Sequence, residues 1–305
     1  MTKITVVGSY VTDLTARTPH MPKPGETVLG GPFRMGPGGK GGNQAVAAAR
    51  LGAEVTMVTK LGRDLFAEEA RRNFQEEGID TRFISESAEE ATGAALIAVD
   101  DHGENMIVVT LGACGDLSAA DVAEAEEAIA ASDVVLLQLE TSMEAVEAAV
   151  AAAAEHDRMV ILNPAPFQPV PDALLQQVDC ITPNETEAGL LTGMEVNSRE
   201  TAAAAADILF EKGIGIVIIT LGGDGCYVRE AAGGYHVPAM RAEVYDTTGA
   251  GDAFNGALAH FLAEGKPLAA ASRLANAAAA ISVTRAGTAP AMAYEHELEA
   301  YGIEE

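Results

Sequence analysis

Residues 246–256 read D-T-T-G-A-G-D-A-F-N-G and combine small residues with one acid in a spacing that suits phosphoryl transfer. Gly249, Ala250 and Gly251 leave backbone N–H groups accessible just before an Ala-rich run that we expect to be helical. A helix N-terminus attracts anions, and Asp252 would lie in its first turn. An ionised carboxylate there would act as a base for an attacking hydroxyl, beside N–H donors for the transferred group. A capped helix after a Gly-rich turn is the alternative, so other segments must decide.

A second Gly-rich segment, G-P-G-G-K-G-G-N-Q-A at residues 36–45, precedes an apolar run with helical periodicity. Its Lys40 suggests a phosphate-binding loop of the GxxxxGK[ST] type. Arg34, however, occupies the position of the first Gly, and Gly41 follows the lysine. We therefore predict a Gly-rich turn that lets a ligand approach the backbone closely, with Lys40 and Asn43 as hydrogen-bonding groups. A flexible loop is the alternative interpretation.

The elements that would position these segments follow an α/β pattern. After residue 116, a helical run at 119–131 leads to an apolar strand at 134–139, and a helix at 143–155 leads to a strand at 159–163. Strands that are apolar on both faces are typical of a parallel sheet covered by helices on both sides. We predict an α/β fold of three layers with a mainly parallel central sheet.

The N-terminal third of the chain predicts a second, smaller sheet. Residues 94–99 and 106–110 are β-prone runs joined by a short polar link that contains glycine, which is the pattern of a hairpin. Residues 19–39 are rich in Pro and Gly around a short β-prone piece at 27–29. We expect this flap to join the hairpin in a small antiparallel sheet, separate from the sheet that the strand at 3–7 begins.

Polar residues occur where several strands of the expected main sheet stop. Ligands of open α/β sheets bind at the carboxyl ends of the strands. Turns also favour Asn, Thr and Gly, so each residue alone could be a local cap. Their succession along one edge nevertheless favours a ligand site, made of Glu140, Asn163, Asn184, Glu187, Thr220, Gly222, Gly223 and Gly225.

Composition excludes several classes of protein. The chain has 305 residues, and 19 basic against 45 acidic side chains give a net charge of −26. Such a charge argues against binding to nucleic acid or to an anionic membrane. Cys114, Cys180 and Cys226 form no CxxC pair, so neither a disulfide framework nor a zinc site is indicated. Because there is no export signal and no apolar run of membrane-spanning length, we expect a cytoplasmic protein.

Together, these segments resemble the ribokinase (PfkB-type) sugar-kinase family from the first strand to about Pro290. The motifs keep the family's order: G-G-K-G-G-N-Q-A at 38–45, Q-L-E at 138–140, N-P-A-P at 163–166, P-N-E-T-E at 183–187, I-T-L-G-G-D-G at 219–225, the stretch at 246–256 and V-T-R-A-G-T at 283–288. The resemblance implies a single ribokinase-like domain over residues 1–305. It also implies that the small sheet, about residues 14–37 and 93–111, is a lid over the sugar and that paired lids make a homodimer.

The resemblance also implies roles in catalysis and sugar binding. Asp252 would be the base for the terminal hydroxyl of the sugar. Gly249, Ala250 and Gly251 would form the anion hole for the transferred phosphoryl group. The sugar itself would be held by Val11, Asp13, Gly39, Lys40, Gly41, Gly42, Asn43 and Glu140.

Nucleotide and metal sites follow from the same resemblance. Asn184 and Glu187 match an N-x-x-E motif that organises Mg²⁺ through water and phosphate. ATP contacts are expected from Asn184, Glu187, Thr220, Gly222, Gly223, Gly225, Gly251 and Asn276. An activating monovalent cation, usually K⁺, would lie near Asp246 and Thr248. Backbone oxygens would complete its shell, contributed by Ser282, Arg285, Gly287 and Ala291.

The implied activity is ATP-dependent phosphorylation of the 5-hydroxyl of a pentose, with D-ribose as the first candidate. Two residues depart from the ribokinase pattern, since Val11 and Cys114 each stand where ribokinases carry Asn. An apolar residue at position 11 would tolerate a substrate that lacks a hydroxyl, which makes 2-deoxy-D-ribose the close alternative. A non-catalytic sugar-binding regulator would share the pocket without needing Asp252. A nicotinamide dehydrogenase would need a G-x-G-x-x-G sequence after the first strand, and this is missing.

Overall fold

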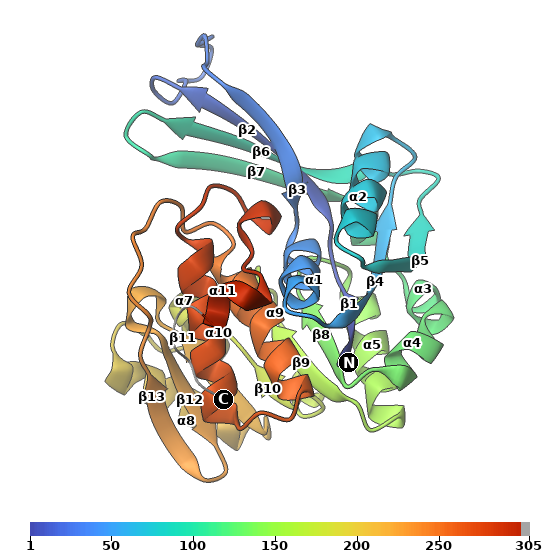
Figure 1. Cartoon of the computed structure of the whole chain (residues 1–305), viewed down its shortest axis with the longest axis vertical. Coiled ribbons are helices and arrows are strands. Elements are labelled where there is room, and N and C mark those ends of the chain that lie inside the picture. Colours follow the sequence, from blue (N-terminus) through green and yellow to red (C-terminus); the bar gives the residue numbers. More distant parts are fainter. Residues whose placement is uncertain (300–305) are drawn as a thin grey trace.

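The computed structural model describes residues 1–299 and contains two β-sheets (Figure 1). The larger sheet has nine strands. Neighbouring strands pair in parallel from β11 to β5, whereas β12 pairs antiparallel with both β11 and β13. This confirms the prediction of a mainly parallel sheet. The strand order is β13 (Gly233–Val237), β12 (Cys226–Glu230), β11 (Ile216–Thr220), β10 (Cys180–Ile181), β9 (Met159–Asn163), β8 (Val134–Gln138), β1 (Lys3–Val7), β4 (Glu54–Leu61) and β5 (Asp80–Glu86).

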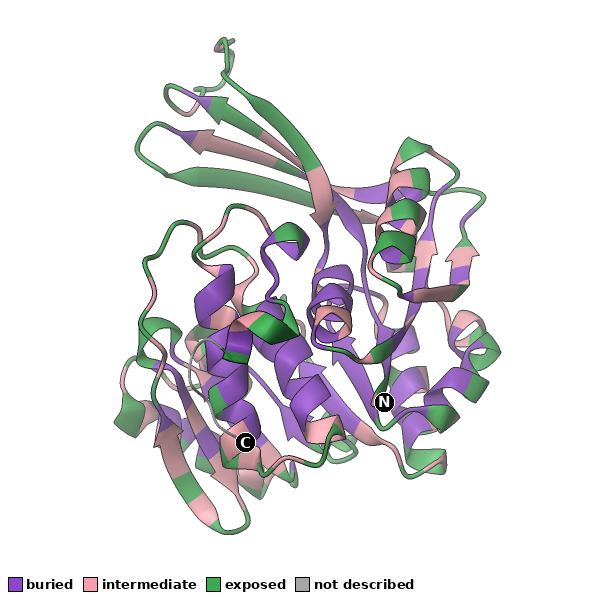
Figure 2. Cartoon of the chain, in the orientation of Figure 1, coloured by how far each residue is buried: buried purple, intermediate pink, exposed green. Residues whose placement is uncertain are grey.

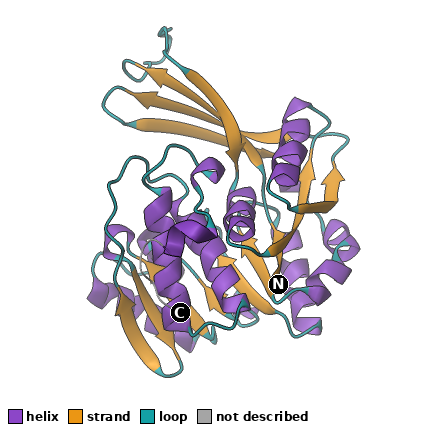
Figure 3. Ribbon diagram, in the orientation of Figure 1, coloured by secondary structure: helices purple, strands orange, loops and turns teal. Residues whose placement is uncertain are grey.

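Helices cover both faces of this sheet, which gives the predicted three layers (Figure 3). One helical layer contains α1 (Lys40–Arg50), α2 (Leu65–Glu76), α9 (Ala250–Ala263), α10 (Leu268–Ser282) and α11 (Glu295–Glu299). The other layer contains α3 (Ala119–Glu124), α4 (Glu126–Ala131), α5 (Met143–Glu155), α6 (Asp172–Leu175), α7 (Glu185–Thr192) and α8 (Arg199–Glu211).

The sequence of β8 shows why two hydrophobic cores form. Successive side chains of a strand point to opposite faces of the sheet. Val134 and Leu136 pack into the core beneath α1, α9 and α10, whereas Val135 and Leu137 pack into the core beneath α5 and α8. A strand buried on both faces therefore needs an apolar residue at every position. Helices α1, α9 and α10 are themselves mostly buried (Figure 2).

The smaller sheet projects from the body of the molecule (Figure 1). Its strand order is β3 (Phe33–Gly38), β2 (Val11–Thr18), β6 (Thr92–Asp100) and β7 (Asn105–Gly112). The predicted hairpin is present as β6 and β7. The sheet is not wholly antiparallel as expected, because β2 and β6 pair in parallel. These two strands both enter from the large sheet, after β1 and β5, and so run in the same direction.

Two predicted elements differ in detail. Residues 27–29 form no strand; they lie in an exposed irregular segment, and the strand of this region is β3 instead. Gly30, Gly31 and Pro32 separate the short β-prone piece from β3. The helix expected at 119–131 is divided into α3 and α4 at Ala125, whose backbone angles (φ −93°, ψ 6°) are not helical. Within residues 1–299, no helix has the length and apolar character needed to cross a bilayer.

Candidate active site

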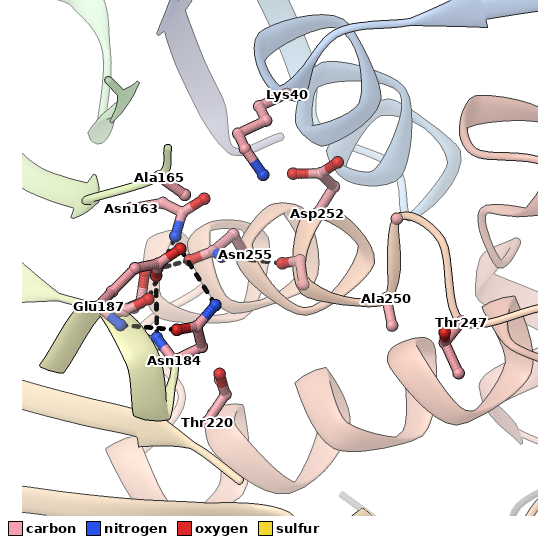
Figure 4. Close-up of a pocket in the computed structure, with 13 residues that line it drawn as sticks. Lys40, Asn163, Ala165, Asn184, Glu187, Thr220, Thr247, Ala250, Asp252 and Asn255 are labelled. Carbon is pink, nitrogen blue, oxygen red and sulfur yellow. Dashed lines mark hydrogen bonds between the residues drawn. The ribbon is translucent and has the colours of Figure 1, made fainter. Parts of the chain in front are cut away.

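A pocket lies at the carboxyl ends of the parallel strands, where ligands of α/β sheets bind (Figure 4). Lys40 and Asp252 point toward one another on one side of it, and Asn184 and Glu187 lie on another side (Figure 4). The structure therefore brings together nine residues expected in the site: Lys40, Asn163, Asn184, Glu187, Thr220, Gly249, Ala250, Gly251 and Asp252. The same pocket is also lined by Ala165, Thr182, Thr247 and Asn255.

The N-terminus of α9 opens into this pocket. Gly249 is the N-cap and has a positive φ of 78°, a conformation that glycine adopts without strain. A side chain at Gly251 would meet no atom within 4 Å, so its backbone faces open space. The N–H of Ala250 donates to the Thr247 carbonyl (3.2 Å). Of the residues expected to form the anion hole, Ala250 thus has its N–H engaged within the turn. The next N–H groups of the first turn are those of Gly251 and Asp252, at the end of the helix that attracts anions.

Two amides of α1 hold the carboxylate of Asp252. Asn43 Nδ2 donates to Oδ2 (2.9 Å), and Gln44 Nε2 donates to Oδ1 (3.0 Å). Asp252 is only 6% exposed, so these bonds lie in a region of low dielectric. The contact is possible because α1 and α9 cross closely: a Cβ at Gly256 would lie 2.5 Å from the Gln44 carbonyl oxygen. Amide hydrogen bonds to both oxygens fix the orientation of the carboxylate.

Gln44 belongs to a buried chain of amides that sequence reasoning missed. Its Nε2 also lies 3.1 Å from Asn163 Oδ1, and its Oε1 accepts a hydrogen bond from Gln138 Nε2 (2.7 Å). Gln44 and Gln138 are both 0% exposed. The signal was present, because both residues belong to the family motifs, but nothing in one sequence indicates that they contact Asp252.

The glycines at the start of α1 serve protein packing as well as access for a ligand. The helix begins at Lys40, so the segment expected to be a turn or loop is in part its first turn. A Cβ at Gly41 would lie 2.7 Å from the backbone N and O of Ser9, and a Cβ at Gly39 would lie 2.7 Å from the backbone N of Val11. Gly39, the N-cap, also has a positive φ of 83°. Glycine is thus required where α1 contacts the connection between β1 and β2.

Glu140 follows β8 and lies at the N-terminus of α1. One of its carboxylate oxygens, Oε2, accepts hydrogen bonds from the Ser9 hydroxyl and from the Lys40 N–H (2.8 Å). A carboxylate at this end of a helix is favoured by the helix dipole. Burial would lower the pKa of the Lys40 ammonium, but the nearby carboxylates of Asp252, Glu140 and Glu187 hold it above its ordinary value. Lys40 is therefore charged in the pocket.

Val11 and Asp13 lie on the same face of β2, because they are two residues apart in a strand. Val11 is 3% exposed, and a Cβ at Gly93 would lie 2.8 Å from its Cγ1. Burial, with smaller contributions from the charges of Glu140 and Asp252, raises the pKa of Asp13 to about 7. A hydrogen bond from Thr288 opposes this rise. Asp13 is accordingly a carboxylate whose charge is sensitive to pH near neutrality.

Cys114 is explained by its hydrogen bonds. The N–H of Tyr10 donates to its sulfur (3.2 Å), and its S–H lies near the carbonyls of Tyr10 (3.1 Å) and Lys60 (3.3 Å). Burial raises the pKa of this thiol, which therefore remains protonated. One donor and two acceptors are also the complement of an Asn side chain. Cys114, in place of the family's Asn, thus keeps hydrogen bonds to the backbone of Tyr10, which leads into β2.

Asn184 and Glu187 form a capping box at the start of α7. The Asn184 side chain accepts the Glu187 N–H (2.8 Å), and the Glu187 carboxylate accepts the Asn184 N–H (2.9 Å) and Nδ2 (3.1 Å). Burial raises the pKa of Glu187. Residues 1–299 contain no cluster of three His, Cys, Asp or Glu side chains suited to a metal. Asn184 and Glu187 bring side-chain oxygens to the pocket, and such oxygens fit a Mg²⁺ that they would hold through water and phosphate.

The remaining nucleotide candidates lie outside the pocket described above. Gly222 and Gly223 form a short 3-10 helix after β11, with open space where side chains would be. Gly225 has a positive φ of 94°, and a Cβ there would lie 2.2 Å from the Val237 carbonyl oxygen. Asn276 is 6% exposed, and its Nδ2 donates to the carbonyls of Val237 (3.2 Å) and Pro238 (3.1 Å). Asn276 thus ties α10 to the end of β13.

Two loops expected to hold a monovalent cation lie side by side. The carboxylate of Asp246 accepts the N–H of Thr248 (2.9 Å) and the N–H of Gly287 (3.1 Å). Partial burial would raise the pKa of Asp246, but these hydrogen bonds hold it below its ordinary value. Of the other candidates, Ser282 accepts the Arg285 N–H through its carbonyl (3.2 Å), and Ala291 lies in a 3-10 helix at 289–291. A carboxylate that stays ionised fits a cation that prefers oxygen ligands.

Comparison with known proteins identifies the family. The family described as "pfkB family carbohydrate kinase" matches residues 1–293. The chain belongs to this family. A ribokinase of Haemophilus influenzae is 44% identical over 284 residues, which cover 93% of each chain, and a deoxyribokinase of Salmonella typhi is 40% identical over 286 residues, 93% of this chain and 94% of the relative. The structure of Arabidopsis thaliana ribokinase complexed with ribose and ATP superposes with a TM-score of 0.92 at 29% identity, covering 98% of each chain.

This PfkB kinase is therefore a carbohydrate kinase with the fold that the sequence predicted. Sequence reasoning found the residues of the pocket that stand at strand ends and helix N-termini. It missed Asn255, which lines the pocket itself, and four residues that support the site from outside the lining, namely Ser9, Gln44, Gln138 and Thr288. Except for Thr288, these residues bond within the buried interior, where one sequence gives no indication of partners.

Proposed function

We propose that this kinase transfers the γ-phosphoryl group of ATP to the 5-hydroxyl of D-ribose, giving ribose 5-phosphate and ADP. The observation that carries the proposal is the Asp252 carboxylate at the N-terminus of α9, oriented by Asn43 and Gln44 beside donors suited to phosphate. The ribokinase relatives support ribose as the acceptor and ATP as the donor.

The chain's own groups would carry each part of the reaction. Asp252 accepts the proton of the 5-hydroxyl as that oxygen forms a bond to the γ-phosphorus. The bond from phosphorus to the β,γ-bridging oxygen breaks, and ADP leaves with that oxygen. The N–H groups of Gly251 and Asp252, with the ammonium of Lys40, stabilise negative charge on the transferred group. Mg²⁺ bound with ATP would neutralise phosphate charge, held through water near Asn184 and Glu187.

2-Deoxy-D-ribose is the second candidate substrate, and Val11 is the reason. Its side chain is buried on the face of β2 that carries Asp13, which we assign to the sugar hydroxyls. A polar side chain at this position would be left unpaired by a deoxy sugar, whereas a valine is not. The deoxyribokinase relative supports this candidate.

The test is release of ADP measured over a panel of sugars with ATP and Mg²⁺. We expect turnover with ribose and 2-deoxyribose well above that with hexoses. In Val11→Asn, the ratio of kcat/KM for ribose to that for 2-deoxyribose should rise. A wild type that strongly prefers ribose, with a ratio unmoved by Val11→Asn, would exclude Val11 as the selector. Tight sugar binding with no ADP release from any sugar would instead favour a non-catalytic regulator.

We also propose that the smaller sheet is a lid over the sugar and that it pairs with a second copy. The register places Phe33, Met35, Leu96, Met106 and Val108 on one face, opposite the face that carries Asp13. Each of these side chains is at least 48% exposed. Apolar side chains gathered on one exposed face are typical of a protein interface. A homodimer joined through these faces would cover them.

Two further proposals concern the monovalent cation and the location of the protein in the cell. We propose that K⁺ binds between the loops at 246–248 and 282–291, where the Asp246 carboxylate is ionised. It would sit beside the N-cap of α9 and add positive charge near the anion site. We keep the cytoplasm as the proposed location because the three cysteines are free and buried.

A further inference from the structure

Thr288 connects three parts of the molecule that are distant in sequence. It follows Gly287 and is 6% exposed. Its hydroxyl lies 3.2 Å from Asp13 Oδ2 on β2 and 2.9 Å from the Pro37 carbonyl oxygen on β3. Both neighbours are acceptors, so the hydroxyl is the donor, and its single hydrogen is shared between the Asp13 carboxylate and the nearer Pro37 carbonyl. Thr288 thus contacts the smaller sheet near the end that joins the main body of the molecule.

The backbone of Thr288 lies against the catalytic helix. A Cβ at Gly249, the N-cap of α9, would lie 3.3 Å from Thr288 Cα and 3.5 Å from its Cβ. The preceding residue, Gly287, donates its N–H to the Asp246 carboxylate. Thr288 is therefore held on one side by the loop beside the anion site, and on the other side it holds Asp13.

The Asp13 carboxylate is held in its orientation by two contacts, one with Gly38 and one with Thr288. A Cβ at Gly38 would lie 2.3 Å from Asp13 Oδ1 and 2.7 Å from Oδ2, so the carboxylate packs directly on the Gly38 backbone. The Thr288 hydroxyl engages Oδ2. A carboxylate packed on one side and bonded through one oxygen presents its other oxygen, Oδ1, in a fixed direction. Binding of a sugar hydroxyl costs less conformational entropy when the acceptor is already fixed in place.

We propose that Thr288 is a positioning residue for sugar binding, which holds the Asp13 carboxylate in the orientation that accepts sugar hydroxyls. The proposal deepens the function proposed above and rests on it. Thr288 touches neither the transferred phosphoryl group nor Asp252. It therefore acts on the affinity for the acceptor sugar, with little effect on the chemical step or on ATP.

The test compares Thr288→Val with Thr288→Ser. Valine keeps the shape of the side chain and removes the hydroxyl, whereas serine keeps the hydroxyl. Because hydrogen bonds to charged groups are among the stronger ones, we expect Thr288→Val to raise KM for the sugar about tenfold. The kcat and the KM for ATP should stay within about twofold, and Thr288→Ser should restore the KM for the sugar. Thr192→Val is the matched control, since the Thr192 hydroxyl donates to the Ala188 carbonyl of its own helix.

Calorimetric titration of each variant with the pentose that the wild type binds separates this proposal from the proposed function. A wild type that binds a pentose but releases no ADP overturns the kinase assignment, and the titration still measures what Thr288 does. Unchanged sugar affinity in Thr288→Val overturns the role of Thr288. So does equal loss of sugar affinity in the serine and valine variants, or a fall in kcat that matches the rise in KM, because either result indicates a merely structural role.

Discussion

Asp252 is the residue on which the proposed chemistry depends. General-base assistance contributes on the order of 10²–10⁴-fold, so we expect Asp252→Asn to lower kcat by about that factor while sugar affinity is largely kept. The replacement fits, because Asn43 Oδ1 is buried without a hydrogen-bond partner among residues 1–299, and its amide can turn to accept from the new NH₂ group. Steady-state kinetics and sugar titration check both expectations.

The control for this variant is Asp133→Asn, at the opposite end of the parallel strands. Asp133 accepts the Lys3 N–H (2.8 Å) and lies away from the pocket. Asp133→Asn should leave kcat unchanged. A near-normal kcat in Asp252→Asn would remove Asp252 from the role of base.

Asp13 should make sugar binding depend on pH. Its pKa is raised to about 7, mainly by burial and also by Glu140 and Asp252, so the carboxyl gains a proton as the pH falls below that value. A protonated carboxyl is a poorer acceptor for sugar hydroxyls. We expect the Kd for the sugar to be flat above pH 8 and to rise by up to about tenfold per unit below pH 6. Calorimetry from pH 5.5 to 8.5 measures this, and Asp13→Asn, which does not titrate, should bind weakly and show no such slope.

At the scale of elements, the cation proposal concerns two loops and the helix that follows one of them. If K⁺ binds beside Asp246, activity should rise with K⁺ when tetramethylammonium keeps the ionic strength constant. Asp246→Ala should blunt this response, while Asp246→Asn, which retains one acceptor oxygen for Thr248 or Gly287, separates loss of charge from loss of loop structure. Equal rates in K⁺ and in the organic cation would contradict the proposal.

The elements show what one sequence can predict. The run at β8 is apolar at each position from Val134 to Leu137, and this alone indicated a buried parallel strand. Helix α5 and strand β9 have the predicted bounds because local patterns set them. The parallel pairing of β2 with β6 joins residues about eighty positions apart and leaves no local pattern. For the same reason, Gln44 appeared as part of a motif, but its bond to Asp252, 208 residues away, could not be read from the chain.

At the scale of the whole molecule, the exposed apolar face of the smaller sheet predicts a homodimer. We expect light scattering coupled to size exclusion to give about twice the 31.4 kDa of one chain. Val108→Glu places a charge on this face, where the side chain is 62% exposed, and should shift the protein toward the monomer.

Ile107→Glu is the matched control for the dimer. Ile107 is the neighbouring residue of β7 and is 49% exposed, but its side chain points to the opposite face of the sheet. It should leave the oligomeric state unchanged. A wild type that runs as a monomer at micromolar concentration, or a dimer unaffected by Val108→Glu, would contradict the proposed interface.

The place of Asp13 along β2 has a mechanical consequence. Val11 pairs with Gly38 and Gly93 at the end of the smaller sheet that joins the body, and Thr18 pairs at the far end. With about 3.3 Å per residue, the far end lies roughly 23 Å from Val11, whereas Asp13 lies roughly 7 Å from it. If the smaller sheet closes over the sugar as proposed, a rotation about that junction would have its axis beside Val11 and Asp13. In such a closure the far end would travel about three times as far as Asp13, so Asp13 would stay close to the acceptor while the outer part of the sheet moves.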